Sequence, residues 1–274
     1  LERDKMKSLL FKCVSFFIVA FPCWGNELYV AQIGDGFTAT ITQDGTNNEI
    51  GGITDTPITG DGVTITLTQQ GDYMDVEGHV SGDDNTLTTY QGGGADNSFI
   101  RGSVVGSNNT VDLRQGKKID GSIDWNDSGN HEQYITITGD SNNVITSQVN
   151  SNGASSDHHM AHIITGDSNT LSHLQYADKK KEGFVEITGD SNTVSLQQRN
   201  SGNHFADIVL TGDDHTVTSV QRGGTGSHNL ELDLTNAGGE YTVTTTQNSS
   251  TAQTYSLTGM CTATAGCGVT VTQY

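Results

Sequence analysis

The chain has 274 residues, a formal net charge of −19 and a hydrophobic content of only 32%. The acidic balance argues against a nucleic-acid partner, because phosphate binding requires clustered lysine and arginine. The polar composition argues against an ordinary apolar core, which leaves a disordered chain or a repeat fold with a thin core. Proline is common in disordered chains but occurs only twice here, which favours the repeat fold.

Residues 1–25 are predicted to be upstream residues followed by a secretory signal peptide. Met6 opens a segment in which two lysines lead into an apolar run from 13 to 21, with small residues near Gly25. This order is typical of a signal peptide, and the run is too short to span a membrane comfortably. The expected mature chain is 26–274, without a transmembrane segment. Loss of four basic and two acidic side chains takes its charge from −19 to −21.

From residue 32 onward the chain repeats a twelve-residue frame, whose clearest copy is ITGDSNNVITSQ at 137–148. Every copy closes on glutamine, 22 to 33 residues after the previous one. Ten copies are counted in this way. Repeats of this length indicate an array in which each unit contacts its neighbours. The closing glutamines are Gln43, Gln69, Gln91, Gln115, Gln148, Gln175, Gln198, Gln221, Gln247 and Gln273.

Each frame is predicted to form a strand, a tight arc and a second strand. The third residue is usually glycine, followed by Asp, Ser and Asn, which are turn formers that accept positive φ or bond to their own backbone. β-Formers alternate on either side, with Ile137 first and Val144 eighth in the clearest copy. Looser return loops, such as 116–133 and 149–162, are expected to join the units. The arc glycines include Gly34, Gly60, Gly82, Gly106, Gly139, Gly166, Gly189 and Gly212.

The predicted fold is therefore all-β: a two-strand-per-rung β-solenoid of about ten stacked strand–arc–strand repeats. Stacking in register places equivalent residues about 4.8 Å apart. The first and eighth columns then face each other as a thin core. The glutamines are expected to form an amide ladder in which each side chain both donates and accepts.

Several polar clusters are explained by exposed turns, loops or faces. Asp follows the arc glycine in seven copies, as at Asp140, where it is interpreted as a solvent-facing turn residue, with calcium as an uncommitted alternative. The HHMAH segment, 158–162, and the basic run 179–181 are both predicted to be solvated loops, with metal binding by His158, His159 and His162 as the less favoured alternative. Cys261 and Cys267 are close in sequence near the end of an exported chain and form a possible disulfide.

The sequence does not favour an enzyme. No nucleophile elbow, phosphate loop or paired carboxylate set stands apart from the repeat pattern, so no catalytic residue, cofactor or metal site is predicted.

The repeats resemble those of the curlin family. The first unit, QIGDGFTATITQ at 32–43, is similar to the curlin pattern Q-x-G-x-x-N-x-A-x-x-x-Q, and Gly139, Asn142 and Gln148 match its Gly, Asn and second Gln. Most later units replace the first glutamine by Ile, Val or Leu. The resemblance implies a secreted subunit that polymerises into cell-surface cross-β fibres for biofilm matrix and adhesion. It also implies a nucleator subunit and an outer-membrane secretion apparatus as partners.

Both ends of the predicted array favour self-assembly over a closed monomer. Leu28 enters the first frame almost directly after the expected cleavage site, and GVTVTQY, 268–274, is the tenth closing strand. Open strand edges template another chain, so head-to-tail stacking would complete them. The alternative function is a monomeric solenoid that binds ice or a surface ligand through a face of Thr-x-Thr pairs, such as Thr64 and Thr66.

Overall fold

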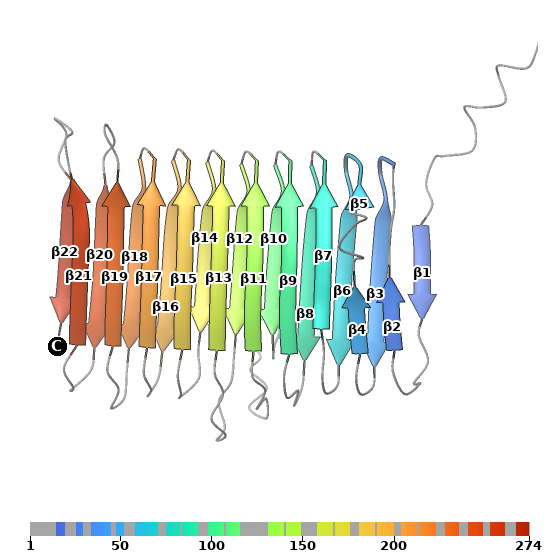
Figure 1. Ribbon diagram of the computed structural model, residues 1–274, viewed down its shortest axis with the longest axis horizontal. Coiled ribbons are helices and arrows are strands. Elements are labelled where there is room, and N and C mark those ends of the chain that lie inside the picture. The colour runs from blue at the N-terminus through green and yellow to red at the C-terminus, as the bar shows by residue number, and fades with distance from the viewer. Residues whose placement is uncertain are drawn as a thin grey trace, which may run out of the picture.

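The chain folds into two parallel β-sheets whose strands alternate along the sequence (Figure 1). The computed structural model describes residues 15–19, 26–29, 34–44, 48–51, 58–70, 75–82, 84–92, 98–106, 108–115, 131–139, 141–148, 158–166, 168–175, 181–189, 191–199, 204–212, 214–222, 228–235, 241–248, 253–260 and 267–273.

Sheet A contains the strand that follows each arc, together with β1 at its edge. Its eleven strands are, in spatial order, β1 (Ser15–Val19), β3 (Thr38–Asp44), β6 (Thr64–Gln70), β8 (Thr86–Gly92), β10 (Thr110–Gln115), β12 (Asn143–Gln148), β14 (Thr170–Gln175), β16 (Thr193–Arg199), β18 (Thr216–Arg222), β20 (Thr242–Asn248) and β22 (Gly268–Gln273).

Sheet B contains the strand that precedes each arc. Its strands are β2 (Asn26–Tyr29), β4 (Asn48–Gly51), β5 (Ile58–Thr59), β7 (Asp75–Ser81), β9 (Ser98–Val105), β11 (His131–Thr138), β13 (His158–Thr165), β15 (Lys181–Thr188), β17 (His204–Thr211), β19 (His228–Thr235) and β21 (Gln253–Met260). Both β4 and β5 pair with β7, so together they occupy one strand position.

Spatial order follows chain order along the rod, from blue to red in Figure 1. Neighbouring strands within each sheet are parallel, and equivalent repeat positions are partners: Ile137 pairs with Ile164, and Val144 with Leu171. This arrangement is a parallel β-solenoid, and the described residues contain no helix. The predicted all-β solenoid with two facing columns is thereby confirmed.

The core is one residue pair thick and runs between the sheets. The first-column residues Ile58, Val80, Val104, Ile137, Ile164, Ile187 and Leu210 are buried. So are the eighth-column residues Ala39, Ile65, Leu87, Val111, Val144, Leu171, Val194, Val217 and Val243. Side chains alternate between this interior and the solvent, as strand geometry requires. A core this thin depends on neighbouring rungs for its burial.

The two kinds of connection differ in length. Arcs such as 139–142, 166–169 and 189–192 contain four residues each, and the last two, 236–241 and 261–267, contain six and seven. The returns contain from three residues (45–47) to fifteen (116–130). The sheet B strands start earlier than the repeat frame predicts: β11 begins at His131 and β13 at His158. The predicted return loops 116–133 and 149–162 are therefore too long at their ends.

Candidate functional site

The closing glutamines form one buried column in sheet A. Backbone partners run from Gln43 to Gln69 to Gln91, and from Gln115 through Gln148, Gln175, Gln198, Gln221 and Gln247 to Gln273. Those from Gln43 to Gln247 are at most 1% exposed. The side chain of Gln273 lies outside the described residues.

Hydrogen bonding in this column differs from the predicted amide ladder. Each amide nitrogen donates across the core to a backbone carbonyl of sheet B, as Gln148 Nε2 does to His159 O at 2.8 Å and Gln175 Nε2 to Glu182 O at 2.7 Å. Side-chain ladder bonds join Gln198, Gln221 and Gln247, at 2.9 and 3.3 Å. The acceptor is the second residue of the sheet B strand in most rungs and the first residue, Asp75, in β7. The column therefore joins the two sheets.

The arc glycines are required by close stacking of the backbone. Gly166 has φ +142° and donates its N–H to Thr188 O at 2.9 Å. A Cβ on Gly166 would overlap the carbonyl oxygen of Gly139 in the adjacent arc. Positive φ likewise recurs at Gly34, Gly60, Gly82, Gly106, Gly139, Gly189 and Gly212, and all but Gly34 show the same kind of overlap with the preceding arc.

An asparagine ladder in the arcs was missed by the sequence analysis, which treats these residues as turn formers. Asn142 Nδ2 donates to Gly139 O at 2.6 Å, and Asn142 N–H donates to Asn169 Oδ1 at 3.2 Å. Asn169 N–H donates in turn to Asn192 Oδ1 at 3.0 Å. Each buried amide thus closes its own arc and joins it to the next. The ladder contains Asn85, Asn109, Asn142, Asn169 and Asn192.

The last strands leave the core columns exposed. Val269 in β22 is the eighth-column neighbour of Val243 in β20. Val243 is buried, whereas Val269 is 47% exposed. Val271 follows buried Thr245 and is 40% exposed. Leu257 in β21 is the partner of buried Leu232 and is 37% exposed. The interior of the solenoid therefore opens to solvent at the edge formed by β21 and β22.

The opposite edge of sheet A is covered. β1 pairs with β3 in parallel, placing Phe16 beside Ala39 and Ile18 beside Ile41. Ala39 and Ile41 are each 3% exposed. β1 lies within residues 1–25, the predicted signal peptide, so a strand from that segment occupies the edge of β3. That these residues are a cleaved signal peptide stays a prediction.

Two buried histidines face each other across the core. His162 in β13 and His173 in β14 have ring centroids 5.4 Å apart. Burial lowers the pKa of His162 to about 4. Burial, and then the neighbouring His162, lowers the pKa of His173 well below its usual value. Both rings are therefore neutral at pH 7.

The loop predictions for 158–162 and for Lys181 are wrong. His158 and His162 lie in β13 with buried side chains, and Lys181, the first residue of β15, is fully buried. Stacking explains this result, because His131, His158, Lys181, His204 and His228 form one column, and the His204 and His228 rings stack 4.4 Å apart. Lys179 and Lys180 lie outside the described residues.

The remaining predicted features lie on the surface or at the chain's end. Asp35 and Asp61 are exposed at their arcs, whereas Asp83, Asp140, Asp167, Asp190 and Asp213 lie outside the described residues. Cys267 is disulfide-bonded. Cys261 lies outside the described residues, so its pairing with Cys267 stays a prediction.

In the described ranges, no three His, Cys, Asp or Glu side chains are grouped so as to hold a metal ion. Nor does that part of the chain contain a helix with the length and apolar character needed to cross a membrane. Comparisons of the chain with protein-family models, with curated proteins and with solved structures found no match.

Proposed function

We propose that this chain is a curlin-type structural subunit, built from ten repeat units, that stacks head-to-tail into extracellular amyloid-like fibres. The fibre would serve biofilm matrix and surface adhesion at the cell surface, after export through the signal peptide. A nucleator subunit and an outer-membrane secretion apparatus would be its partners. No catalysis or cofactor is involved.

The exposed core columns of β22 carry this proposal. A strand edge with unpaired backbone groups templates another chain, and here the edge also presents Val269 and Val271 from columns that are buried in the preceding rung. Burial of apolar side chains favours association by about 25 cal/mol per Å². Addition of another parallel strand would cover them.

The β3 edge of sheet A, at the other end of the rod, has the same spacing of core columns as β22. The described pairing of β1 with β3 places alternate residues beside Ala39 and Ile41, which belong to the eighth and tenth columns. In a head-to-tail stack, β22 of one subunit would take the place of β1. Val269 would then lie over Ala39 and Val271 over Ile41. Both sheets would continue from subunit to subunit in the same register.

The decisive experiment compares two lysine variants of β22 in seeded growth. Purified 26–274 is followed by thioflavin fluorescence and electron microscopy, with and without preformed seeds. Val271→Lys places a charge in the stacking interface and should slow seeded elongation at least about tenfold, since burying an unpaired charge is costly. Thr270→Lys is the matched control, because its partner Thr244 lies on the outer face.

Unbranched fibres with a 4.7–4.8 Å cross-β reflection are the expected product. A monomer that stays stable with seeds present, or equal slowing by both variants, would contradict stacking through this edge.

A monomeric ice- or surface-binding solenoid is the second candidate. It is favoured by the outer face of sheet A, where Thr38, Thr64, Thr86 and Thr110 are consecutive partners. A second threonine row, Thr40, Thr66 and Thr88, runs beside it and ends at Asp112, which forms an ion pair with Arg114 at 2.5 Å. Thermal hysteresis of the monomer that is lost in Thr66→Lys would support this function in place of the fibre.

A further inference from the structure

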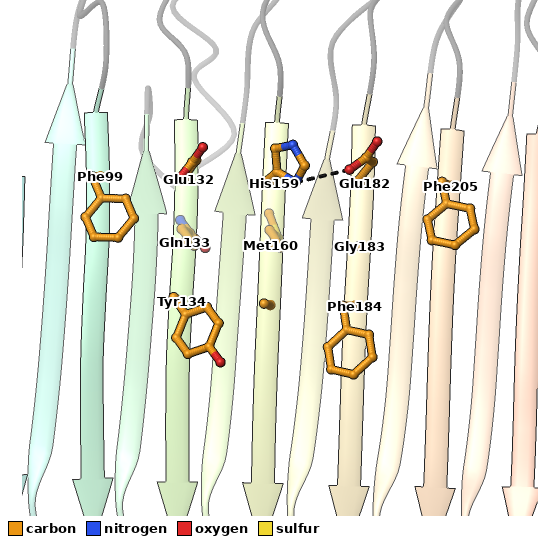
Figure 2. A pocket seen from close by; sticks show the side chains of 11 residues that line it. Phe99, Glu132, Gln133, Tyr134, His159, Met160, Glu182, Gly183, Phe184 and Phe205 are labelled. Atoms are coloured by element: carbon orange, nitrogen blue, oxygen red, sulfur yellow. Dashed lines mark ion pairs between the residues drawn. The ribbon is translucent and has the colours of Figure 1, made fainter.

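The outer face of sheet B carries a hollow of about 310 Å³ on β9, β11, β13, β15 and β17. Four aromatic side chains and two glutamates line it: Phe99, Tyr134, Phe184, Phe205, Glu132 and Glu182 (Figure 2). It faces away from the core columns and lies in the middle of the rod, so neither stacking edge includes it.

Ala161 creates the central gap. Tyr134, Ala161 and Phe184 are consecutive partners on β11, β13 and β15. Since neighbouring strands lie about 4.8 Å apart, the two rings rise from strands roughly 10 Å apart, with only a methyl group between them. A group placed midway would lie within about 6 Å of both rings, the range of a cation–π contact.

Carboxylates border the gap on the side of the strand starts. Glu132, His159 and Glu182 are consecutive partners, and His159 Nδ1 lies 3.2 Å from a Glu182 carboxylate oxygen. Glu132 is exposed and forms no ion pair within the described ranges. Asp207, the partner of Phe184 on β17, adds a further carboxylate beside the hollow. Together these groups give the aromatic hollow a negative border.

One of these rings, that of Phe99, already makes a cation–π contact with a side chain of the protein, Arg101. The Arg101 guanidinium carbon lies 4.8 Å from the centroid of the Phe99 ring. Arg101 is the partner of Tyr134 on the neighbouring strand and is exposed. The aromatic surface of sheet B therefore already supports the type of contact that the Tyr134–Phe184 gap would make.

We propose that this hollow is a binding site for an organic cation, of the quaternary ammonium or alkylated amine class. The cation lies between Tyr134 and Phe184 above Ala161, and the Glu132 carboxylate neutralises it. Aromatic rings attract such poorly hydrated cations through their negative faces, and a nearby carboxylate adds charge complementarity. The site lies on the outer face of sheet B. The assignment holds for the soluble chain and does not depend on fibre formation.

Choline is a suitable probe, with 3,3-dimethylbutan-1-ol as its neutral counterpart of the same shape. Binding to the full chain is measured by calorimetry and by ligand-observed NMR. We expect choline to bind at least about tenfold more tightly than the neutral alcohol, because charge drives the contact. Equal affinity for the two probes, or no detectable choline binding by either method, would overturn the proposal.

Two pairs of variants locate the site. Tyr134→Leu keeps an apolar side chain without a ring and should weaken choline binding about fivefold, whereas Tyr134→Phe should retain it. Glu132→Gln should weaken binding by a similar factor. Glu49→Gln is its control, since Glu49 lies in the same outer column three strands away and makes the same change in net charge.

The three substituted side chains are wholly or partly accessible to solvent, so circular dichroism should show unchanged folding. Choline binding that is indifferent to Tyr134→Leu, or equally weakened by both glutamate variants, would overturn the assignment. Tighter binding of cellobiose than of choline would instead identify a carbohydrate site and reject the cation.

Discussion

At the scale of single residues, the arc glycines occupy positions where no side chain fits. Stacking brings each arc so close to the preceding one that no side chain fits between them, and positive φ adds a conformational cost for any other residue. Glycine at this position is thus dictated by the neighbouring rung as much as by its own turn.

Gly166→Ala should therefore lower the free energy of unfolding by about 2–4 kcal/mol. Its Cβ would overlap the backbone of Gly139. Gly78→Ala is the matched control, because an added Cβ there meets no atom within 4 Å. Urea unfolding of the purified chain, followed by circular dichroism, measures both. Similar unfolding midpoints for the two variants would refute the close-approach argument.

The buried pair His162 and His173 should make the fold sensitive to acid. Above pH 6.5 each ring is neutral in the folded and unfolded states, so it contributes no pH dependence. Below pH 6.5 the unfolded chain binds protons that the folded chain does not, so stability falls as pH falls toward 4. The lowering of the His162 pKa from 6.5 to about 4 corresponds to about 3 kcal/mol.

Urea unfolding between pH 7.5 and pH 4 tests this expectation. His162→Val, which introduces the residue type of its buried column neighbour Val185, should flatten the pH profile over this window. His159→Gln, on the outer face, should leave most of the slope. A profile unchanged by His162→Val would show that other groups control acid sensitivity.

At the scale of the element, the arc owes its stability to hydrogen bonds that run in two directions. Asn169 illustrates both: its Nδ2 donates to Gly166 O at 2.7 Å within the arc, and its Oδ1 accepts from Asn142 N–H at 3.2 Å in the adjacent arc. Loss of this one amide leaves the buried N–H of Asn142 and the partly buried carbonyl of Gly166 without these partners.

Asn169→Ala should accordingly destabilise the fold by about 2–3 kcal/mol. Thr170→Ala, one residue further on at an exposed position, should change stability by less than about 0.5 kcal/mol. Hydrogen exchange of the Asn142 backbone amide reports directly on the hydrogen bond to Asn169. The exchange rate should rise in Asn169→Ala and stay unchanged in Thr170→Ala. Unchanged protection of that amide would contradict the ladder.

The sheet A strands are predictable from sequence because every repeat shows the same residue types there, closing on glutamine. The sheet B strands share only an alternation of inward and outward positions, and their inward residues include His131, Met160 and Lys181. Buried histidine and lysine are uncommon, so the HHMAH segment resembles a loop. One usable signal is present: His131, His158, Lys181 and His204 each stand eight residues before an arc glycine.

The recurrence of glutamine predicts a glutamine column. It does not predict the hydrogen bonds of that column, because the length of a return connection does not show which sheet B carbonyl will lie beside the glutamine side chain. The hollow on sheet B could not be predicted from the sequence either. Tyr134, Ala161 and Phe184 are separated by more than twenty residues from one to the next and become neighbours only through the register of the stack.

At the scale of the whole molecule, the two ends of sheet A differ, since β22 exposes its core columns while β1 covers β3. If subunits add through these edges, a chain that retains residues 1–25 has one of them occupied. Seeded elongation by 1–274 should then be slower than by 26–274, by about tenfold. Fluorescence growth curves at equal monomer concentration measure the ratio. Equal rates would mean that β1 does not obstruct addition.

The two sides of the rod differ in the lengths of their connections: the arcs lie on one side and the returns on the other. The seven arcs from 60–63 to 212–215 contain four residues each, which keeps their glycines stacked on one another, and the connections before and after them on this side of the rod are longer. The returns already vary from three residues to fifteen without loss of register. Foreign peptides of that size inserted into the returns would therefore be displayed in a single line along the rod, at intervals of about 4.8 Å. The molecule is in this respect a ready scaffold for dense, ordered presentation of short sequences.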